Sequence, residues 1–270
     1  MPFPKEQAVP EDQSSAPIPA RNVIDDEQLK RMMKQNQRGF LQRNRFRMVT
    51  LCLIAFNVAV FAVEAVLSGF RVNISTRVLV EMGAMYAPWV QSAADLYRFV
   101  TPMFLHMDLM HLGFNMVALY SVGEVLERVL GKGNFLALYF VGGITGNAVS
   151  YAADVFLGGG ATVSAGASTS VFGLFVAVAL LGLLHKGNRS VFAQYSKSML
   201  TIIAVNVAYT FLVPGISVSG HLGGALGGLV AMFMLPSKNL RVPNAVRVAT
   251  AVLWVAALGY LLASQGLLAL

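Results

Sequence analysis

Four polar side chains stand in stretches of this sequence that are otherwise apolar. They are Ser168 in SAGASTSVFG, His221 in SGHLGGALGG, and His111 and Asn115 in HLGFN. Polar groups inside a membrane are costly and usually face a bundle interior or a water-filled cavity. A serine within hydrogen-bond reach of a histidine is the minimum of an activated nucleophile. These residue types therefore predict acyl-transfer chemistry, provided that the fold brings them together.

Acyl transfer also needs hydrogen-bond donors aimed at the oxyanion of the transition state, each worth about 2.7–4 kcal/mol. His111 and Asn115 are four residues apart and project from one helical face, so both are candidate donors. The backbone N–H of Ser168 is a third candidate if Ser168 begins a helix. The usual third member of a triad is an acid, but residues 155–270 contain no Asp or Glu. We therefore expect a Ser/His dyad whose imidazole is oriented by packing, with the Phe172 ring as a stacking floor.

Each of these residues has a purely structural interpretation when it is taken alone. A serine beside Gly and Ala in a membrane span is usually a packing residue, and Asn115 alone could be interhelical glue. His106 lies five residues before His111 and does not share its helical face, so His106 is expected to support the first outer loop. His221 shares its face with Gly224, and such glycines let another helix approach closely. The prediction depends on the conjunction of the four polar residues.

Composition indicates an integral membrane protein. Hydrophobic residues make up 56% of the 270 residues and charged residues 12%, which is far too apolar for a soluble domain of this size. Backbone polar groups in lipid must be bonded internally, so helices are expected. The net charge of +7 could suggest nucleic acid, but the basic residues gather in the N-terminal segment and between apolar runs. The single cysteine, Cys52, provides no disulfide framework and is expected to pack.

Seven apolar runs approach the roughly 20 residues that a membrane span requires. They are Met48–Leu67, Met110–Leu126, Phe135–Phe156, Ala167–Leu184, Ser198–Val213, Ser217–Leu235 and Val246–Leu268. Residues 68–109 are too polar to span and too long for a turn, so they are expected to form a partly embedded interfacial loop.

Three segments are predicted along the chain. Residues 1–47 form a disordered and basic cytoplasmic tail, residues 48–235 form a six-helix core, and residues 236–270 form a linker and an additional C-terminal transmembrane helix.

The distribution of Lys and Arg predicts the orientation, because these residues are enriched in short cytoplasmic loops. With the N-terminus inside, the outer connections near Gly158 and Pro214 contain none of them, whereas the first outer loop breaks the pattern. The short cytoplasmic loops receive Arg128, Lys132, Lys186, Arg189, Lys197, Lys238, Arg241 and Arg247. With this orientation, all four polar candidates fall at the outer end of their spans, where water can reach them.

Three segments resemble the motifs of the rhomboid family of intramembrane serine proteases. They are YRFVTPMFLHMDLMHLGFNMVALYSVGEVLERVLGKG from Tyr97 to Gly133, GASTSVFG around Ser168, and GHLGGALGG after Ser219. They occur in the family's order and spacing, and the resemblance covers roughly Met48 to Leu235. It implies a rhomboid-like bundle of six transmembrane helices plus a seventh C-terminal helix.

The resemblance also implies a role for each matching residue. Ser168 would be the nucleophile, His221 the general base and then acid, His111 and Asn115 the oxyanion stabilisers, Gly166 and Ala167 the shapers of the nucleophile turn, Phe172 the support of His221, and Arg98 part of the embedded loop. The fifth span and residues 214–220 would act as a lateral gate and cap. The implied partners are single-span membrane-protein substrates and membrane lipids, with no nucleic acid, and no metal or cofactor is implied. The N-terminal tail, the single cysteine and the compact core favour a bacterial plasma (inner) membrane, with an organelle membrane as the alternative.

Two residues depart from the family pattern. Thr169 stands where the family most often has glycine, and its branched side chain beside the nucleophile could narrow the site or change substrate choice. Tyr97 replaces a common tryptophan, which is a milder change.

Two other classes of function stay open at this point. One is a catalytically silent rhomboid-like protein that binds or retains membrane clients. The other is a channel or transporter, which would favour internally repeated halves that this sequence does not clearly contain.

Overall fold

The computed structural model describes residues 27, 44–45, 47–158, 162–187, 189–212 and 217–268. The chain divides into two units, Met1–Arg43 and Asn44–Leu270, and all the helices named below belong to the second. The predicted disordered tail, residues 1–47, lies outside the described residues except at 27, 44, 45 and 47.

The described part of the second unit is helical and contains no named strand, which confirms the predicted all-α class. Its long helices are α3 (Met48–Leu67), α5 (Leu109–Leu130), α6 (Lys132–Leu157), α7 (Ser168–Leu184), α8 (Arg189–Leu212), α9 (Val218–Met234) and α10 (Asn244–Ser264). Four of them, α3, α5, α6 and α10, are long and apolar enough to cross a membrane, and α7 and α9 are shorter apolar helices. The count of six plus one membrane spans therefore stays a prediction.

The predicted span boundaries differ most from the structure at α8. This helix begins at Arg189, nine residues before the predicted start at Ser198. The additional turns have the polar sequence RSVFAQYSK. Hydropathy locates the segment that favours lipid, whereas a helix continues for as long as its backbone hydrogen bonds do. The apolar run therefore marked only the later part of α8.

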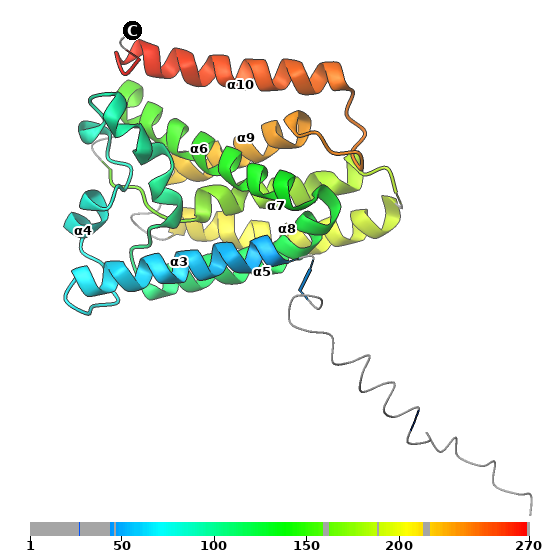
Figure 1. Ribbon diagram of the computed structural model, residues 1–270, viewed down its shortest axis with the longest axis horizontal. Helices are drawn as coiled ribbons and strands as arrows, with labels where there is room; N and C mark the ends of the chain where they lie inside the picture. Colours follow the sequence, from blue (N-terminus) through cyan, green and yellow to red (C-terminus); the bar gives the residue numbers. More distant parts are fainter. Residues whose placement is uncertain are drawn as a thin grey trace, which may run out of the picture. The chain divides into compact units, whose positions relative to one another are not determined.

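Successive long helices run in alternating directions (Figure 1). Helices α6, α7 and α9 lie in the middle of the bundle, α3 and α5 lie side by side below them in this view, and α10 lies above. One hydrogen bond joins α10 to α6, from Trp254 Nε1 to Thr145 Oγ1 at 2.9 Å. The two helices that carry the candidate dyad are thus central, and α10 is peripheral.

Helices α7 and α9 make backbone contact through glycine. A Cβ atom at Gly224 would overlap the carbonyl group of Thr169, and one at Gly228 would overlap the carbonyl group of Gly173. Small residues permit such close crossings between membrane helices. The crossing at Gly224 brings the first turn of α9 beside the first turn of α7.

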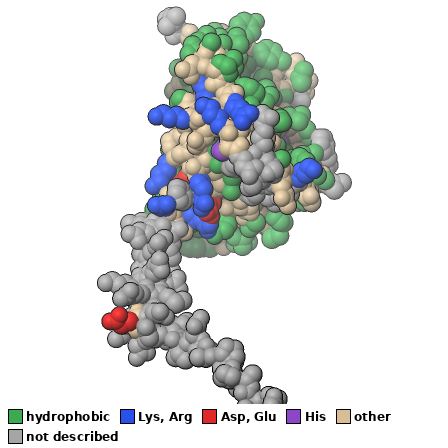
Figure 2. Space-filling view, turned by 90° about the vertical axis from the view of Figure 1, so that its right-hand side faces the viewer, with side chains coloured by type: hydrophobic (Ala, Val, Ile, Leu, Met, Phe, Trp, Pro, Cys, Tyr) green, Lys and Arg blue, Asp and Glu red, His purple; other side chains and the backbone are tan. Residues whose placement is uncertain are grey.

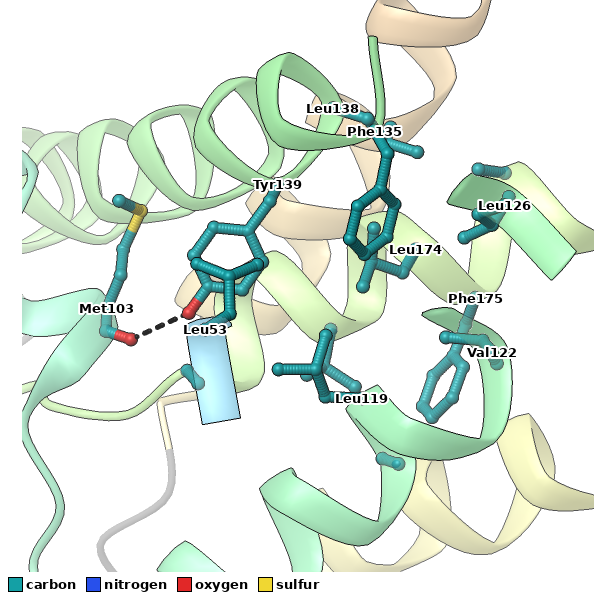
Figure 3. Close-up of a cluster of buried hydrophobic side chains, with 14 of the residues drawn as sticks. Leu53, Met103, Leu119, Val122, Leu126, Phe135, Leu138, Tyr139, Leu174 and Phe175 are labelled. Atoms are coloured by element: carbon teal, nitrogen blue, oxygen red, sulfur yellow. Dashed lines mark hydrogen bonds between the residues drawn. The ribbon is translucent and has the colours of Figure 1, made fainter. Parts of the chain in front are cut away.

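A core of fully buried side chains packs α7 against α5 and α6 (Figure 3). It combines Leu119 of α5, Phe135 and Tyr139 of α6, and Leu174 and Phe175 of α7, all with no exposed surface. The hydroxyl of Tyr139 donates a 3.1 Å hydrogen bond to the carbonyl oxygen of Met103, shown as the dashed line in Figure 3. The core therefore also anchors the segment that precedes α5.

The predicted interfacial loop is built from short helices. They are α4 (Thr76–Glu81), η1 (Ala87–Trp89), η2 (Ala93–Phe99) and η3 (Thr101–Phe104). Buried Arg98 holds them together, since its Nη1 atom donates to the carbonyl oxygens of Val80 and Ala84, each at 2.9 Å. Its guanidinium also lies over the ring of Trp89, 5.2 Å from the centroid. Arg98 thus belongs to the structure of the loop.

Positive charge gathers at one end of the helices. Figure 2 views the molecule from the right-hand side of Figure 1, where α5, α7 and α9 end, and Lys and Arg side chains cluster there. At this end, Glu127 accepts hydrogen bonds from the backbone N–H groups of Val49 and Thr50, each at 3.1 Å. A carboxylate at the start of α3 satisfies N–H groups that a helix N-terminus leaves unpaired.

The structure corrects the expectation for Cys52. This thiol was expected to pack, but it is exposed on α3. Helix α3 has a narrow buried face, and Cys52 precedes Leu53, which is one of the residues on that face.

Candidate active site

Ser168 and His221 meet at the crossing of α7 and α9. Ser168 is the first residue of α7, and His221 lies in the first turn of α9. The Oγ atom of Ser168 and the Nε2 atom of His221 are 2.7 Å apart, which is a normal hydrogen-bond distance. The structure thus joins two residues that are 53 positions apart in the sequence.

The turn before Ser168 requires glycine at position 166. Gly166 has φ +144°, and a Cβ atom there would lie 2.6 Å from Cε1 of His111 and 3.2 Å from Oγ of Ser168. Its N–H group donates to the carbonyl oxygen of Pro102 at 2.8 Å. Ala167, which is fully buried, then caps α7. The turn therefore places the ring of His111 directly beside the serine.

The imidazole of His221 stacks on Phe172. The ring centroids are 4.2 Å apart and the planes differ by 16°. Phe172 follows Ser168 by one helical turn, so the aromatic ring lies under the pair on the same face of α7. The structure places Phe172 where the sequence analysis expected a stacking floor.

A second contact of the imidazole was not anticipated from the sequence. The Nδ1 atom of His221 lies 2.7 Å from Oγ1 of Thr210, on α8, and the contact is buried. The sequence analysis assigned the orientation of the ring to packing alone. A signal was present, because Asn206 and Thr210 are polar residues four apart in an apolar run and so share a helical face.

His111 and Asn115 open onto the same cavity as the serine and the imidazole. This cavity has a volume of about 160 Å³ and is lined by His111, Phe114, Asn115, Ser168, Val171, Phe172, Val205, Asn206 and His221. The Nδ2 atom of Asn115 donates to the carbonyl oxygen of His111 at 2.9 Å. An amide nitrogen has two hydrogens, so a second donor is available to a group in the cavity.

His106 lies behind His111 and does not line the cavity. Its side chain is fully buried, its ring meets that of His111 edge-on at 5.3 Å, and its backbone N–H donates to the carboxylate of Glu64 at 3.1 Å. Burial, with a smaller contribution from the charge of His111, lowers the pKa of His106 to about 3. A neutral ring is therefore packed against His111.

Thr169 packs against α6 and α9. Its Cβ and Cγ2 atoms face Gly146 of α6 and Gly220 of α9, and it is not among the residues that line the cavity. Thr169 therefore does not narrow this cavity, and its effect on substrate choice stays a prediction. Thr169 instead fills space between α6 and α9.

Of the sequence-predicted residues, the structure brings together Ser168, His221, His111, Asn115, Gly166, Ala167 and Phe172. Gly224 makes the helix crossing, whereas Arg98 belongs to the loop. Among the described residues, no group of three or more His, Cys, Asp or Glu side chains is arranged to hold a metal ion.

The fold and site define a class of protein, a helical membrane protein with a partly buried serine–imidazole pair near one end of its bundle. The family model of the rhomboid domain matches residues 93–238. This match covers more than half of the chain and includes every residue of the cavity. The chain belongs to the rhomboid family.

Curated relatives agree with this assignment. Rhomboid protease GluP of Bacillus subtilis is 34% identical over 183 residues, which are 67% of this chain and 34% of the relative. Rhomboid-like protease 3 of Toxoplasma gondii is 33% identical over 166 residues, which are 61% of this chain and 60% of the relative. Rhomboid protease AarA of Providencia stuartii is 26% identical over 239 residues, which are 78% of this chain and 83% of the relative. The chain thus spans about a third of the length of the first of these relatives.

Proposed function

We propose that this protein is a serine-type intramembrane endopeptidase that uses Ser168 and His221 as a catalytic dyad. The single observation that carries the proposal is the 2.7 Å separation of Ser168 Oγ and His221 Nε2 in a cavity among apolar helices. A serine becomes an effective nucleophile when an adjacent base takes its proton. The protease names of the relatives support the same chemistry.

In the proposed reaction, the imidazole takes the proton of Ser168 Oγ as that oxygen bonds to the substrate carbonyl carbon. His221 then returns the proton to the nitrogen of the leaving amine, and the peptide C–N bond breaks. Water then attacks the carbonyl carbon of the acyl-enzyme while His221 takes a proton from it. His221 returns this proton to Ser168 Oγ as the ester bond breaks. The stack on Phe172 supports this role, because it keeps the ring from turning away from the serine.

Three donors would bind the oxyanion. They are the amide of Asn115, the ring of His111 and the backbone N–H of Ser168. The first two line the cavity that contains the serine, and the third belongs to the first residue of α7, whose N–H has no partner within its own helix. Preorganised donors of this kind are most effective where water is largely excluded.

We infer that the substrates are single-span membrane proteins, cut in or near the outer leaflet. The cavity is lined by Phe114 of α5 and Val205 of α8, both exposed on the surface of the bundle, which favours lateral entry between these helices. A helical substrate hides its carbonyl groups in hydrogen bonds. Segments that unwind easily, such as those with Gly or Pro near the cut, should therefore be preferred.

The proposed location is a bacterial plasma membrane, with the N-terminus in the cytoplasm and six core spans plus α10. The cluster of Lys and Arg at the end where α5, α7 and α9 finish supports this orientation, because such residues are enriched on the cytoplasmic side. The dyad lies at the opposite end of α7 and α9, toward the outer face.

The test is cleavage of a single-span model substrate by the purified full-length protein in detergent. Ser168→Ala and His221→Ala should each abolish cleavage, and Ser168→Ala should also abolish labelling by a fluorophosphonate. Ser170→Ala is the matched control, since Ser170 is a buried serine on the same helix that does not line the cavity. It should keep both cleavage and labelling. Cleavage that persists in folded Ser168→Ala protein would exclude the dyad and favour a client-binding protein with a contaminating protease.

A further inference from the structure

The imidazole of His221 has hydrogen-bond partners on both of its ring nitrogens. Nε2 faces Ser168 Oγ at 2.7 Å, and Nδ1 faces Thr210 Oγ1, also at 2.7 Å. A neutral imidazole carries one N–H, so one nitrogen donates and the other accepts. Only the tautomer with the proton on Nδ1 leaves Nε2 free to take the proton of the serine.

The hydrogen bonds of Thr210 decide between the two tautomers. Its hydroxyl has a single proton, and this proton is donated to the carbonyl oxygen of Asn206 at 2.8 Å, one turn earlier in α8. The oxygen of Thr210 can then act toward His221 only as an acceptor. Both contacts of Thr210 are hydrogen bonds only when Nδ1 carries the proton and donates it to Thr210, which leaves Nε2 as the free base.

We propose that Thr210 is a positioning residue that holds His221 in the tautomer and orientation needed to deprotonate Ser168. The proposal rests on the dyad proposed above and supplies the third member that the sequence does not provide as an acid. In a serine triad, an acid holds the imidazole in its correct tautomer. Here, a neutral hydroxyl, oriented by the α8 backbone, takes that place.

The contribution of Thr210 should grow during the reaction. When Ser168 Oγ–H transfers its proton to Nε2, the imidazole becomes positively charged and the Nδ1–H group becomes a stronger donor. Hydrogen bonds to charged groups are stronger than those between neutral groups. The bond to Thr210 therefore stabilises the transition state more than the resting enzyme, which means that it should affect kcat and leave KM nearly unchanged.

Thr145 provides a matched control on another helix. Its hydroxyl donates to the carbonyl oxygen of Val141, four residues earlier, at 2.6 Å and accepts an aromatic N–H, that of Trp254, at 2.9 Å. This arrangement has the same hydrogen-bond pattern as that of Thr210, but it joins α6 to α10, beside Gly227 of α9, and Thr145 does not line the cavity of the dyad. An indole N–H can only donate. Thr145 Oγ1 therefore accepts the hydrogen bond from Trp254 while it donates its own proton to Val141, which is the pattern inferred for Thr210.

The kinetic experiment compares Thr210→Val, Thr210→Ser and Thr145→Val on the same single-span substrate, with Ser168→Ala as the inactive reference. Thr210→Val should lower kcat roughly 10- to 100-fold with KM within about twofold. Thr210→Ser, which keeps the hydroxyl, should recover kcat to within about threefold of the wild type. Thr145→Val should keep the wild-type kcat. A wild-type kcat in Thr210→Val, or a kcat in Thr210→Ser as low as that of Thr210→Val, would overturn the assignment.

A spectroscopic measurement on the wild-type protein tests the same assignment without any substitution at Thr210. In protein labelled with ¹⁵N-histidine, the signals of His221, assigned by their loss in His221→Gln, should be those of the tautomer protonated on Nδ1. Protonation on Nε2, or an equal mixture of the two, would overturn the role of Thr210. An active Ser168→Ala variant would instead remove the dyad itself, so failure of the positioning role and failure of the proposed function are distinguishable.

Discussion

At the scale of single residues, the site contains several groups that hold others in place. Gly166 admits the ring of His111, Phe172 supports the imidazole, and His106 packs behind His111. Each of these contacts limits the orientations that the neighbouring ring can adopt. Activity and stability can therefore be separated by substituting groups that face the cavity and groups that stand behind it.

Asn115→Ala should lower kcat by about 10²- to 10³-fold, because it removes one oxyanion donor. The expected effect on thermal stability is small, since the amide bonds only the carbonyl of its own helix. Ser121→Ala is the control, as it removes a similar side-chain bond to the carbonyl four residues earlier on the same helix but outside the cavity. Kinetics and thermal unfolding of both variants give the comparison, and an unchanged kcat in Asn115→Ala would remove this residue from the oxyanion site.

His106 should make stability depend on pH. Its pKa is lowered by burial to about 3 in the folded protein, whereas an unperturbed histidine has a pKa near 6.5. The unfolded chain therefore binds more protons below pH 6.5, and the free energy of unfolding decreases as pH falls from about 6.5 toward 3, by up to about 1.4 kcal/mol per pH unit. Glu64, which accepts a hydrogen bond from the backbone N–H of His106, and His111, whose ring contacts that of His106, can also titrate.

The measurement is the thermal unfolding of the wild type and of His106→Gln in detergent between pH 7.5 and pH 4. Since Glu64 and His111 are present in both proteins, the difference between the two isolates the contribution of His106. His106→Gln should lose less stability than the wild type on acidification. Parallel stability curves would show that His106 is not kept neutral by the fold.

At the scale of the elements, the dyad depends on the crossing of α7 and α9. This crossing is possible because Gly224 and Gly228 leave no side chain between the two backbones. Overpacking a tight contact forces backbone shifts that typically cost about 1–3 kcal/mol. Since Ser168 and His221 stand on these two helices, a shift of one helix also separates the two atoms of the dyad.

Gly228→Ala should therefore lower both the unfolding temperature and kcat, although position 228 lies about two turns from His221. Gly259→Ala is the matched control, because a Cβ atom at Gly259 of α10 would meet nothing within 4 Å. It should leave both quantities at or above the wild-type values, as Ala is the better helix former. If the two variants behaved alike, close packing at the crossing would not be what positions the dyad.

At the scale of the whole chain, the ends of the helices sort into two sets. Backbone hydrogen bonds join the end of α7 to the segment after α9, from Arg241 N–H to the carbonyl of Leu184. At the other end, Met85 in the loop pairs with Ser164 just before α7. Lys and Arg gather at the first of these ends, and the cavity lies toward the second.

Labelling with a membrane-impermeant thiol reagent tests the proposed orientation. In a Cys52→Ala background, Thr162→Cys should react in intact cells, because residue 162 lies just before α7 on the expected outer side. Lys238→Cys, after α9, should react only when the membrane is opened. The reverse pattern would place the dyad at the cytoplasmic face and would contradict the orientation. Retained cleavage activity is the control for native folding of both variants.

The amino-acid sequence by itself determined the helical membrane class, most helix positions and the small set of polar residues worth considering. These features depend on hydropathy, helical period and motif, which act over a few turns of chain. Only the tertiary structure decided that Ser168 and His221 lie in contact, that Thr169 packs against Gly146 and Gly220, and that Thr210 meets the second ring nitrogen of His221. Each of these contacts depends on the position of one helix against another. That position follows from packing among side chains and glycine backbones far apart in the sequence, which no local pattern records.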